Sequence, residues 1–289
     1  LDEADEMLRM GFIDDVTWIL DHTPKQRQVA LFSATMPAVI RKVANTYLNN
    51  PEEIKIEAKT ATVDSVTQRY WKAVGTSKLD AMTRILEAED FDGVIVFVRT
   101  KTLTVELAEK LEARGHRASP INGDMSQQLR ERTIEHLKSS KIDIVVATDV
   151  AARGIDVARV SHVINYDIPY DTEAYVHRIG RTGRAGRAGN AILFVAPRER
   201  NMLRSIEKAT RQAITPMDLP SREQVKERRI DQFKASIDKA LEQPDLSIYS
   251  DLVEAFVKER EIAPEQVAAA LAFMAQQDRP LTMPEHSKP

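Results

Sequence analysis

The chain has 289 residues, more than one average domain, so about two domains are expected. Its content of 43% hydrophobic and 29% charged residues excludes a chain that is disordered throughout, and no apolar run is long enough to cross a bilayer. The formal net charge of −3 argues against binding of nucleic acid through overall positive charge, so any such site must be a local basic face.

The first residues and the cysteine count bear on origin and location. The chain starts at Leu1-Asp2-Glu3, with neither an initiator Met nor a signal-peptide pattern, so we expect a truncation at the N-terminus. The absence of Cys excludes disulfides and cysteine-based metal sites and fits a reducing compartment. The expected location is the cytoplasm, without a membrane partner.

Residues 1–57 have the pattern that ends an α/β lobe. An apolar run at 29–32 precedes a Ser-Ala-Thr turn at 33–35, a helix that begins near Pro37 and a short strand at 53–56. Residues 58–67 are rich in Thr and lack periodicity, which predicts an extended linker and a domain boundary.

Residues 68–212 alternate between strand and helix patterns. Strands are expected at 68–74, 93–98, 117–122, 142–147, 160–166 and 190–195, with helices at 78–89, 103–113, 127–138 and 172–177. Continuously apolar strands such as 94–98 are typical of a parallel sheet covered on both faces, which predicts a doubly wound α/β lobe. In such sheets ligands bind beyond the carboxyl ends of strands, which points to the loops that start at Arg99, Thr148 and Asp167.

Residues 213–277 change to a helical pattern. Three apolar stripes recur at helical spacing, the third behind Pro264: Ile230, Phe233, Ile237 and Leu241; Ile248, Leu252, Val253, Phe256 and Val257; and Val267, Leu271 and Met274. Helices of this kind need a partner surface, which is the lobe, one another or a second copy, and a simple helical cap is as good an explanation as a dimer. Residues 278–289 are expected to be a disordered tail.

Two short motifs in the first lobe carry polar side chains. Asp2 and Glu3 are adjacent acids that can hold Mg²⁺ through water and polarise an attacking water. Taken alone, acids at a helix start explain them better. Ser33 and Thr35 precede a helix, where hydroxyl groups are ordinary N-caps.

The strongest signal is the segment from His177 to Gly189. Four of the ten glycines fall within ten residues and alternate with arginines: Gly180, Gly183, Gly186 and Gly189 with Arg178, Arg181, Arg184 and Arg187. Glycine permits close approach of a ligand and guanidinium binds phosphate oxygens, so a phosphate site is favoured over a flexible basic loop that binds nucleic acid loosely. By itself, His177 would more often be structural than catalytic.

Two further segments follow predicted strands. Residues 147–156 place Thr148 and Asp156 where they can meet a phosphate and a ribose, and a structural turn leaves Arg153 and Asp156 unexplained. Residues 123–130 open a helix with Ser126 as the expected cap, and helix N-termini attract phosphate, although simple capping explains the pattern equally well.

Taken together and in order, these motifs resemble the DEAD-box RNA helicase family. The matching segments are DEAD at 2–5, SAT at 33–35, VIVFVRTK at 94–101, QQLR at 127–130, ATDVAARGID at 147–156 and HRIGRTGR at 177–184. Beyond residue 210 the helical segment resembles the bacterial cold-shock members called DeaD or CsdA, in which it mediates dimerisation.

The resemblance implies an ATP-dependent enzyme with two RecA-like lobes. ATP and Mg²⁺ bind between the lobes, single-stranded RNA lies across both, and lobe closure separates a short duplex. The resemblance also implies partners in ribosomal particles or RNA decay and a role in cold adaptation.

Residue roles follow from the matching motifs. Asp2 would position Mg²⁺ through water, Glu3 would orient the hydrolytic water, and Arg181 and Arg184 would be arginine fingers. Lobe coupling would involve Asp5, Ser33, Thr35 and His177. Nucleotide binding would involve Gly154 and Asp156. RNA-backbone contacts would involve Arg99, Gly123, Gln127, Arg130 and Thr148.

The 289 residues contain no G-x-x-x-x-G-K-[ST] loop and no adenine-reading Gln segment before DEAD, so we expect negligible ATP hydrolysis from them alone. A non-catalytic RNA-binding and dimerisation module is the alternative hypothesis. A related DNA helicase is disfavoured by the DEAD tetrapeptide together with HRIGRTGR.

Overall fold

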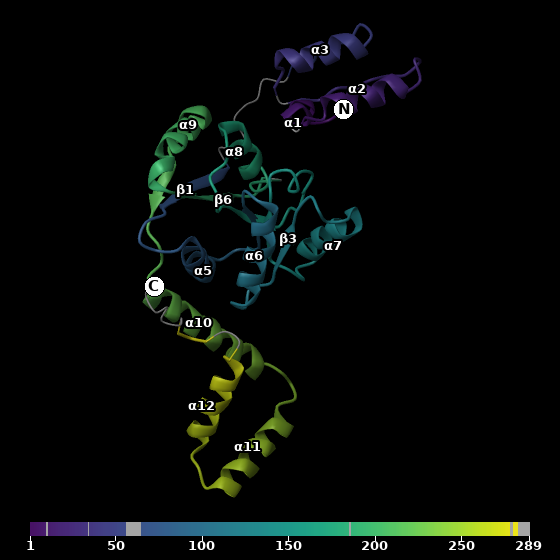
Figure 1. The fold of residues 1–289 in the computed structure, drawn as a ribbon. Helices are drawn as coiled ribbons and strands as arrows, with labels where there is room; N and C mark the ends of the chain where they lie inside the picture. Colours follow the sequence, from purple (N-terminus) through teal and green to yellow (C-terminus); the bar gives the residue numbers. More distant parts are fainter. Residues whose placement is uncertain (10, 34, 56–64, 185, 278–279, 283–289) are drawn as a thin grey trace. The chain divides into compact units, whose positions relative to one another are not determined.

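The chain is described by a computed structural model that covers residues 1–9, 11–33, 35–55, 65–184, 186–277 and 280–282. It divides into two compact units, Leu1–Ala58 and Lys59–Pro289. Figure 1 traces the elements of each unit in chain order.

Among its described residues, the first unit contains three helices and the backbone that joins them. These are α1 (Ala4–Arg9), α2 (Ile13–His22) and α3 (Ala38–Tyr47), and α3 begins directly after Pro37 as expected. A small apolar cluster of Val16, Leu20 and Val43 holds α2 and α3 together. The Phe32 amide donates to the Leu1 carbonyl at 2.8 Å, which aligns the first residues with the run before α3.

The strand expected at 53–56 is wrong for the residues that are described, because 53–55 form no strand and 56 lies outside the described residues. Ile54 is 82% exposed, so its side chain has no core to bury against. A strand exists only when a neighbouring backbone pairs with it, and the local pattern could not reveal that this partner is missing among the described residues.

The second unit is built on a seven-stranded, all-parallel sheet. Its strands are β1 (Val66–Lys72), β2 (Gly93–Phe97), β3 (Ala118–Ile121), β4 (Ile144–Ala147), β5 (Val160–Asn165), β6 (Gly189–Val195) and β7 (Thr215–Met217). They lie in the order β3-β4-β2-β5-β6-β1-β7, with the short β3 and β7 at the two edges. The expected strands all form. β7 was not predicted, since its three residues show no apolar pattern.

Helices cover both faces of this sheet, which confirms the doubly wound α/β lobe. On one face lie α5 (Lys78–Ala88) and α6 (Lys101–Glu112), and on the other lie α7 (Gln127–Lys138), α8 (Thr172–Ile179) and α9 (Arg200–Thr210). The helix α9 was not predicted from the sequence. Its buried residues Leu203 and Ile206 belong to one apolar cluster with residues of α8 and β6.

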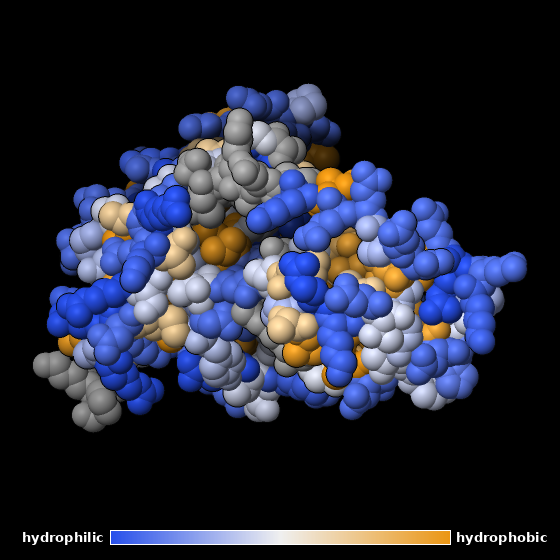
Figure 2. Space-filling view, turned by 90° about the horizontal axis from the view of Figure 1, so that it is seen from above, coloured by the Kyte–Doolittle hydropathy of each residue, from blue (hydrophilic) through white to orange (hydrophobic). Residues whose placement is uncertain are grey.

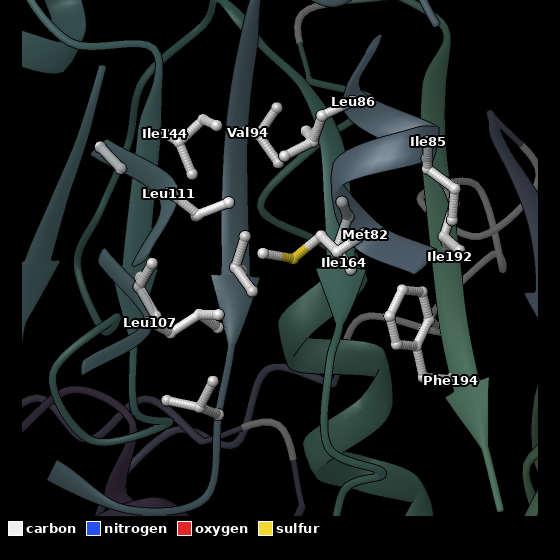
Figure 3. Packing of buried hydrophobic residues seen from close by; sticks show 14 of the residues in the cluster. Met82, Ile85, Leu86, Val94, Leu107, Leu111, Ile144, Ile164, Ile192 and Phe194 are labelled. Atoms are coloured by element: carbon white, nitrogen blue, oxygen red, sulfur yellow. The ribbon is translucent and has the colours of Figure 1, made fainter. Parts of the chain in front are cut away.

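The core follows from the apolar strands. Figure 3 shows Met82, Ile85 and Leu86 of α5 and Leu107 and Leu111 of α6 packed over Val94, Ile144, Ile164, Ile192 and Phe194 of the sheet. Each fully buried side chain of this size contributes about 1.5 to 3 kcal/mol through burial of apolar area. This core makes the sheet a rigid support for the loops at its ends.

Three more helices follow: α10 (Arg222–Leu241), α11 (Ser247–Arg260) and α12 (Pro264–Ala275). The Ser221 hydroxyl accepts from the backbone N–H of Gln224 at 3.0 Å, and the side-chain oxygen of Gln224 accepts from the backbone N–H of Ser221 at 2.7 Å. These two bonds form a capping box at the start of α10. Pro264 is the first residue of α12, as the sequence predicts.

The helix α10 is fastened to α5 by a buried ion pair. Arg229 donates to both oxygens of Glu87, at 3.0 and 3.2 Å, and the two side chains are 7% and 0% exposed. Next to this pair, Arg84 of α5 donates to the Pro220 carbonyl at 2.7 Å, and Val225 is completely buried. The start of the helical segment is therefore part of the second lobe's structure.

Most of the surface visible in Figure 2 is hydrophilic, with separate hydrophobic patches between the charged side chains. Within the residues that are described, no helix combines the length and the apolar character needed to cross a membrane.

Candidate functional site

The first unit brings its acidic motif and its hydroxyl motif together. Asp5 accepts hydrogen bonds from the Thr35 amide at 2.6 Å and from the Thr35 hydroxyl at 2.8 Å. The Asp5 amide donates to the Ser33 hydroxyl at 3.1 Å, and that hydroxyl donates to the Thr35 carbonyl at 2.6 Å. Asp5, Ser33 and Thr35 thus form one closed hydrogen-bonded group.

The carboxyl of Asp5 is 4% exposed, and its protonation is set by this group. Burial raises the pKa of Asp5, but the hydrogen bonds from Thr35 and Ser33 outweigh it and leave the pKa below its ordinary value. Asp5 is therefore ionised at neutral pH and holds the segment at 33–35 against α1.

Asp2 and Glu3 stand just before α1. One carboxylate oxygen of Asp2 accepts the Glu3 amide at 2.9 Å, and the rest of this exposed side chain faces solvent. Glu3 has a positive φ of 50°, an uncommon conformation for this residue type. Among the described residues no group of three His, Cys, Asp or Glu side chains can cage a metal. An exposed Asp2 fits Mg²⁺ held mainly by water and phosphate oxygens, which is how this ion usually binds.

The glycine–arginine segment lies where β5, β6 and β1 begin. Thr182, completely buried, donates from its hydroxyl to the carbonyl of Val160, the first residue of β5, at 2.7 Å. The Gly189 amide donates to the Ser65 carbonyl at 3.0 Å, just before β1. This segment precedes β6 and is therefore not one of the loops after strand ends, at Arg99, Thr148 and Asp167, that the sheet pattern indicated.

Two glycines of this segment are required by space and by conformation. A Cβ on Gly189 would lie 2.6 Å from the Gly183 nitrogen and 2.7 Å from the Thr182 side chain. Gly183 has a φ of 68°, in the left-handed region that glycine tolerates. These positions fix the path of the backbone that carries Arg181 and Arg184.

Arg181 and Arg184 both reach the segment that links β4 to β5. Arg184 is ion-paired with Asp156 and donates through Nε to the Gly180 carbonyl at 2.8 Å. Arg181 donates to the Ile155 carbonyl at 3.2 Å and to the His177 carbonyl at 3.3 Å. Gly154, with a φ of 66°, supplies the turn before Asp156. The structure thus brings Gly154, Asp156, Arg181 and Arg184 together beside the half-buried His177.

This group fits a nucleotide in chemical terms. The side chain of Asp156 is 78% exposed, so one oxygen can accept from a ribose hydroxyl while Arg184 holds the other. Arg184 has five N–H donors in a fixed fork, and its bonds to Gly180 and Asp156 use only two of them. A guanidinium held in this way is preorganised to receive phosphate oxygens.

Arg178 was not assigned a role from the sequence, yet it organises the same region. Its guanidinium is 2% exposed, grips both oxygens of Asp149 at 2.5 and 2.8 Å, and donates to Asn165 and to the Asp167 carbonyl. It also lies 5.0 Å above the Phe97 ring. It therefore ties together the segments that follow β2, β4 and β5. The sequence did contain one signal for this role: Arg178 lies on the same helix face as the apolar residues Tyr175 and Ile179, which indicates that it is buried.

Three of the residues expected to contact the RNA backbone lie beyond the carboxyl ends of the neighbouring strands β3, β4 and β2. We call this end of the sheet its carboxyl edge. Gly123 follows β3, Thr148 follows β4 and Arg99 follows β2. The Arg99 amide donates to Asp167 at 3.0 Å, and its guanidinium lies 5.1 Å from the ring of Tyr170, which is 66% exposed. This edge carries basic groups and exposed glycine backbone.

Gln127 and Arg130 belong to the first turn of α7, capped by Ser126 as predicted, with the Ser126 hydroxyl accepting the Leu129 amide at 3.3 Å. Gln127 donates to Glu131 at 2.8 Å, and Arg130 donates to the Arg153 carbonyl. The bond from Arg130 links α7 to the segment that carries Gly154 and Asp156.

Comparison with known proteins follows the same division. Residues 1–43 match the family profile described as DEAD/DEAH box helicase, 77–186 match the helicase conserved C-terminal domain, and 220–286 match the RNA helicase DeaD dimerization domain. One solved structure, the C-terminal domain of the DEAD-box protein Dbp5, is 37% identical, with 91% of that chain and 53% of this chain covered and a TM-score of 0.50. The chain belongs to the DEAD-box helicase family.

Within that family, the curated relatives are DeaD proteins. The ATP-dependent RNA helicase DeaD of Mycobacterium tuberculosis is 55% identical over 272 residues, which are 94% of this chain and 48% of the relative. The DeaD protein of Escherichia coli K12 is 50% identical over 287 residues, 98% of this chain and 46% of the relative. The chain thus spans about half the length of the curated relatives it matches.

A second DEAD-box structure is similar over more of the chain. Dbp5 of S. cerevisiae bound to RNA and ADP BeF3 is 35% identical, with 75% of this chain and 58% of that chain covered and a TM-score of 0.67. This similarity, together with the parallel sheet, confirms the RecA-like fold expected for the family.

Proposed function

We propose that the protein is an ATP-dependent RNA helicase that separates short duplexes when ATP and RNA bind together. The supporting observation is the separation of two preorganised groups in the second lobe. Gly154, Asp156, Arg181 and Arg184 cluster at one place, while Arg99, Gly123 and Gln127 line the carboxyl edge. Similarity to DeaD helicases at 50 to 55% identity supports the same conclusion.

On the nucleotide side, this chain's own residues position and neutralise phosphate. Arg181 and Arg184 donate to phosphate oxygens as charge develops, since arginine fingers stabilise phosphoryl transfer electrostatically. Asp156 accepts from the ribose while keeping Arg184 in place, and Gly154 permits the close approach. Asp2 would hold Mg²⁺ through water, the ion would neutralise charge on the phosphates, and Glu3 would orient the attacking water.

Asp5, Ser33, Thr35 and His177 are proposed to couple nucleotide state to RNA. The first three move as one unit because of their shared hydrogen bonds. His177 stands one helical turn before Arg181, and its carbonyl accepts a bond from that side chain. A shift of the group of Asp5, Ser33 and Thr35 would therefore move the adjacent Glu3. A shift of His177 would move Arg181.

RNA is proposed to contact the carboxyl edge through its phosphates. Arg99, Gly123, Gln127, Arg130 and Thr148 present guanidinium, amide, hydroxyl and backbone groups there. Such groups recognise sugar and phosphate, which carry no sequence information. The expected binding is therefore independent of RNA sequence.

The test is RNA-stimulated ATP hydrolysis by a protein in which these residues follow a complete first lobe. Arg181→Ala and Arg184→Ala are expected to lower turnover by about 10³- to 10⁵-fold, with RNA binding retained. Arg187→Ala is the matched control, because this arginine of the same segment contacts Asp92 and the Ala158 carbonyl instead. Unchanged turnover in the first two variants would favour the non-catalytic RNA-binding module.

The helical segment is proposed to join two copies of the protein. Ile237, Leu252 and Phe256 are 43%, 66% and 43% exposed, and Phe233 is half-buried. The match to a DeaD dimerization domain over 220–286 supports a second copy as the occupant of this apolar surface. The domain division proposed from the sequence assigns 213–277 to this function.

Sedimentation at micromolar concentration tests the dimer. The wild-type chain is expected to sediment as a dimer and Leu252→Glu as a monomer, because a charge buried in an apolar interface is costly. Val74→Glu, at a 58% exposed apolar residue outside the helical segment, is the control and should remain dimeric. A wild-type monomer would remove the proposal.

Finally, we propose a cytoplasmic role on ribosomal assembly intermediates or messages stabilised by cold, supported by the resemblance to the DeaD branch. Cosedimentation of the protein with ribosomal particles after a shift to low temperature tests this setting. If the protein sediments separately from the ribosomal particles at both temperatures, this proposal is contradicted.

A further inference from the structure

A pocket of about 370 Å³ lies between α9, the end of β1 and β7, away from the two groups described above. Its wall includes Tyr70 and Lys72 of β1, Pro197 after β6, and Arg200 and Arg204 of α9. Figure 1 shows α9 beside β1. Because Lys72 ends β1 and Val195 ends β6, this pocket opens at the carboxyl edge of the sheet, the edge proposed for RNA.

The pocket is lined by three exposed cations, Lys72, Arg200 and Arg204. In the part of the chain that the structure describes, none of the three has an ion-pair partner, whereas Arg69, Arg159, Arg178 and Arg184 of the same lobe do. The one carboxylate in the wall belongs to the half-buried Glu207, which accepts the Ile214 amide at 3.1 Å. The four groups together carry a formal charge of about +2, and the three cations are exposed.

The helix gains nothing from these cations. Arg200 is the first residue of α9, where the helix dipole disfavours positive charge, and the first turn contains no acidic residue. Arg200 and Arg204 stand four positions apart, where like charges on a helix repel each other. The helix is held instead by Leu203, Ile206 and Thr210 on its buried face. An anion bound in the pocket would remove both penalties.

We propose that this pocket binds phosphate groups of an RNA strand that continues past the RNA-facing loops. The proposal rests on the RNA contacts proposed above. In the sheet, β1 is three strands from β2 along the order β2-β5-β6-β1, which is about 14 Å at strand spacing. About four stacked nucleotides span that distance at roughly 3.4 Å each.

The shape of the pocket suits a sugar–phosphate unit. Its volume lies in the range of small-molecule sites, which begin at about 300 Å³. Guanidinium groups one helical turn apart can clasp successive phosphate oxygens, and Lys72 adds a third point charge opposite them. Phosphate chemistry is shared by RNA and by free polyphosphate, so the experiment separates these two sources.

The test is RNA binding by the full chain, measured by fluorescence anisotropy with an RNA of about three nucleotides, too short to reach from the loop after β2 to the pocket, and one of about sixteen. Arg200→Gln with Arg204→Gln should weaken the longer RNA about tenfold at low salt and leave the shorter RNA unchanged. The slope of log affinity against log salt for the longer RNA should fall by about 1.4, since each phosphate contact to a single strand contributes about 0.7.

The matched control removes two charges elsewhere. Lys208→Gln with Lys226→Gln changes two exposed lysines outside the pocket, one of them on α9, and should leave both RNAs unaffected. An equal loss in both double variants would mean that general charge attracts RNA, and would overturn the pocket as a site. Loss of pyrophosphate binding in the arginine variant with RNA binding intact would assign the pocket to free polyphosphate and overturn it as well.

Failure of this inference can be told from failure of the proposed RNA face. If Arg99→Ala weakens both RNAs while the double arginine variant weakens neither, only the pocket is excluded. If the wild-type chain binds neither RNA, both proposals fall.

Discussion

Replacing Arg229 by Met tests whether the helical segment is fastened to the second lobe by its buried ion pair. Arg229 donates to both oxygens of Glu87, whose side chain is fully buried. The variant leaves that carboxylate without its main partner, and removing one member of a buried pair costs about 3 to 5 kcal/mol. His116 lies 3.6 Å from the same carboxylate and can compensate in part, so about 3 kcal/mol is expected.

Urea denaturation can isolate this loss. The chain has two tryptophans, and Trp71 lies in the core beside α5. In a Trp18→Phe background its fluorescence reports on the second lobe alone. With a urea slope of about 1 to 3 kcal/mol per molar, the midpoint should fall by roughly 1 to 3 M.

A double-mutant cycle supplies the control. Glu87→Gln combined with Arg229→Met removes both charges and should cost less than the two single changes added together. A loss below about 1 kcal/mol in Arg229→Met, the size of a surface pair, would refute the reasoning.

Three further outcomes are expected. Gly189→Ala should lower both stability and ATP turnover because its Cβ meets Thr182, whereas Gly186→Ala, with no neighbour within 4 Å, should lower only stability, by about 1 kcal/mol; equal turnover in the two variants would contradict this. Burial raises the pKa of Glu89, but His162 and Arg69 outweigh it and hold that pKa at about 2. The stability that this depressed pKa supplies is complete above pH 4.5 and is lost as pH falls toward 2, so acid unfolding of wild type should be steeper than that of Glu89→Gln. Arg178→Lys should destabilise the lobe by about 3 kcal/mol in thermal unfolding, because lysine cannot replace the fork that joins Asp149 after β4 to Asn165 and Asp167 at the end of β5; a change within 0.5 kcal/mol would exclude this role.

The fold of the second lobe could be predicted from the sequence because its strands consist of continuous apolar runs. Residues 94–98 pack completely on both faces, and a pattern that depends only on burial is local to the strand. Helix caps such as Ser126 were predictable for the same reason, since the hydroxyl and the amide it accepts are three residues apart.

Elements that depend on distant partners were missed or mistaken. β7 forms because Thr215, Pro216 and Met217 pair with β1, and nothing in these three residues indicates that. Residues 53–55 of the strand expected at 53–56 have residue types that suit a strand, but no neighbouring strand pairs with them among the described residues.

The candidate site divides in the same way. The glycine–arginine spacing indicated a phosphate site, and the structure adds which groups hold each side chain, such as Asp156 on Arg184. The role of Arg178 depends on loops after β2, β4 and β5 meeting at one point, and chain order alone does not contain that. The α9 pocket combines residues as far apart in the chain as Tyr70 and Pro216, so it becomes visible only in the folded lobe.

The two edge strands of the sheet limit how copies of the protein can associate. Both edge strands are very short and each contains a proline, Pro120 in β3 and Pro216 in β7. Proline has no N–H to offer a new strand, and short edges give an incoming backbone little to pair with. The sheet is thereby protected against growing into a continuous aggregate. The proposed dimer would then rest on side chains of helices, where association can be specific and reversible.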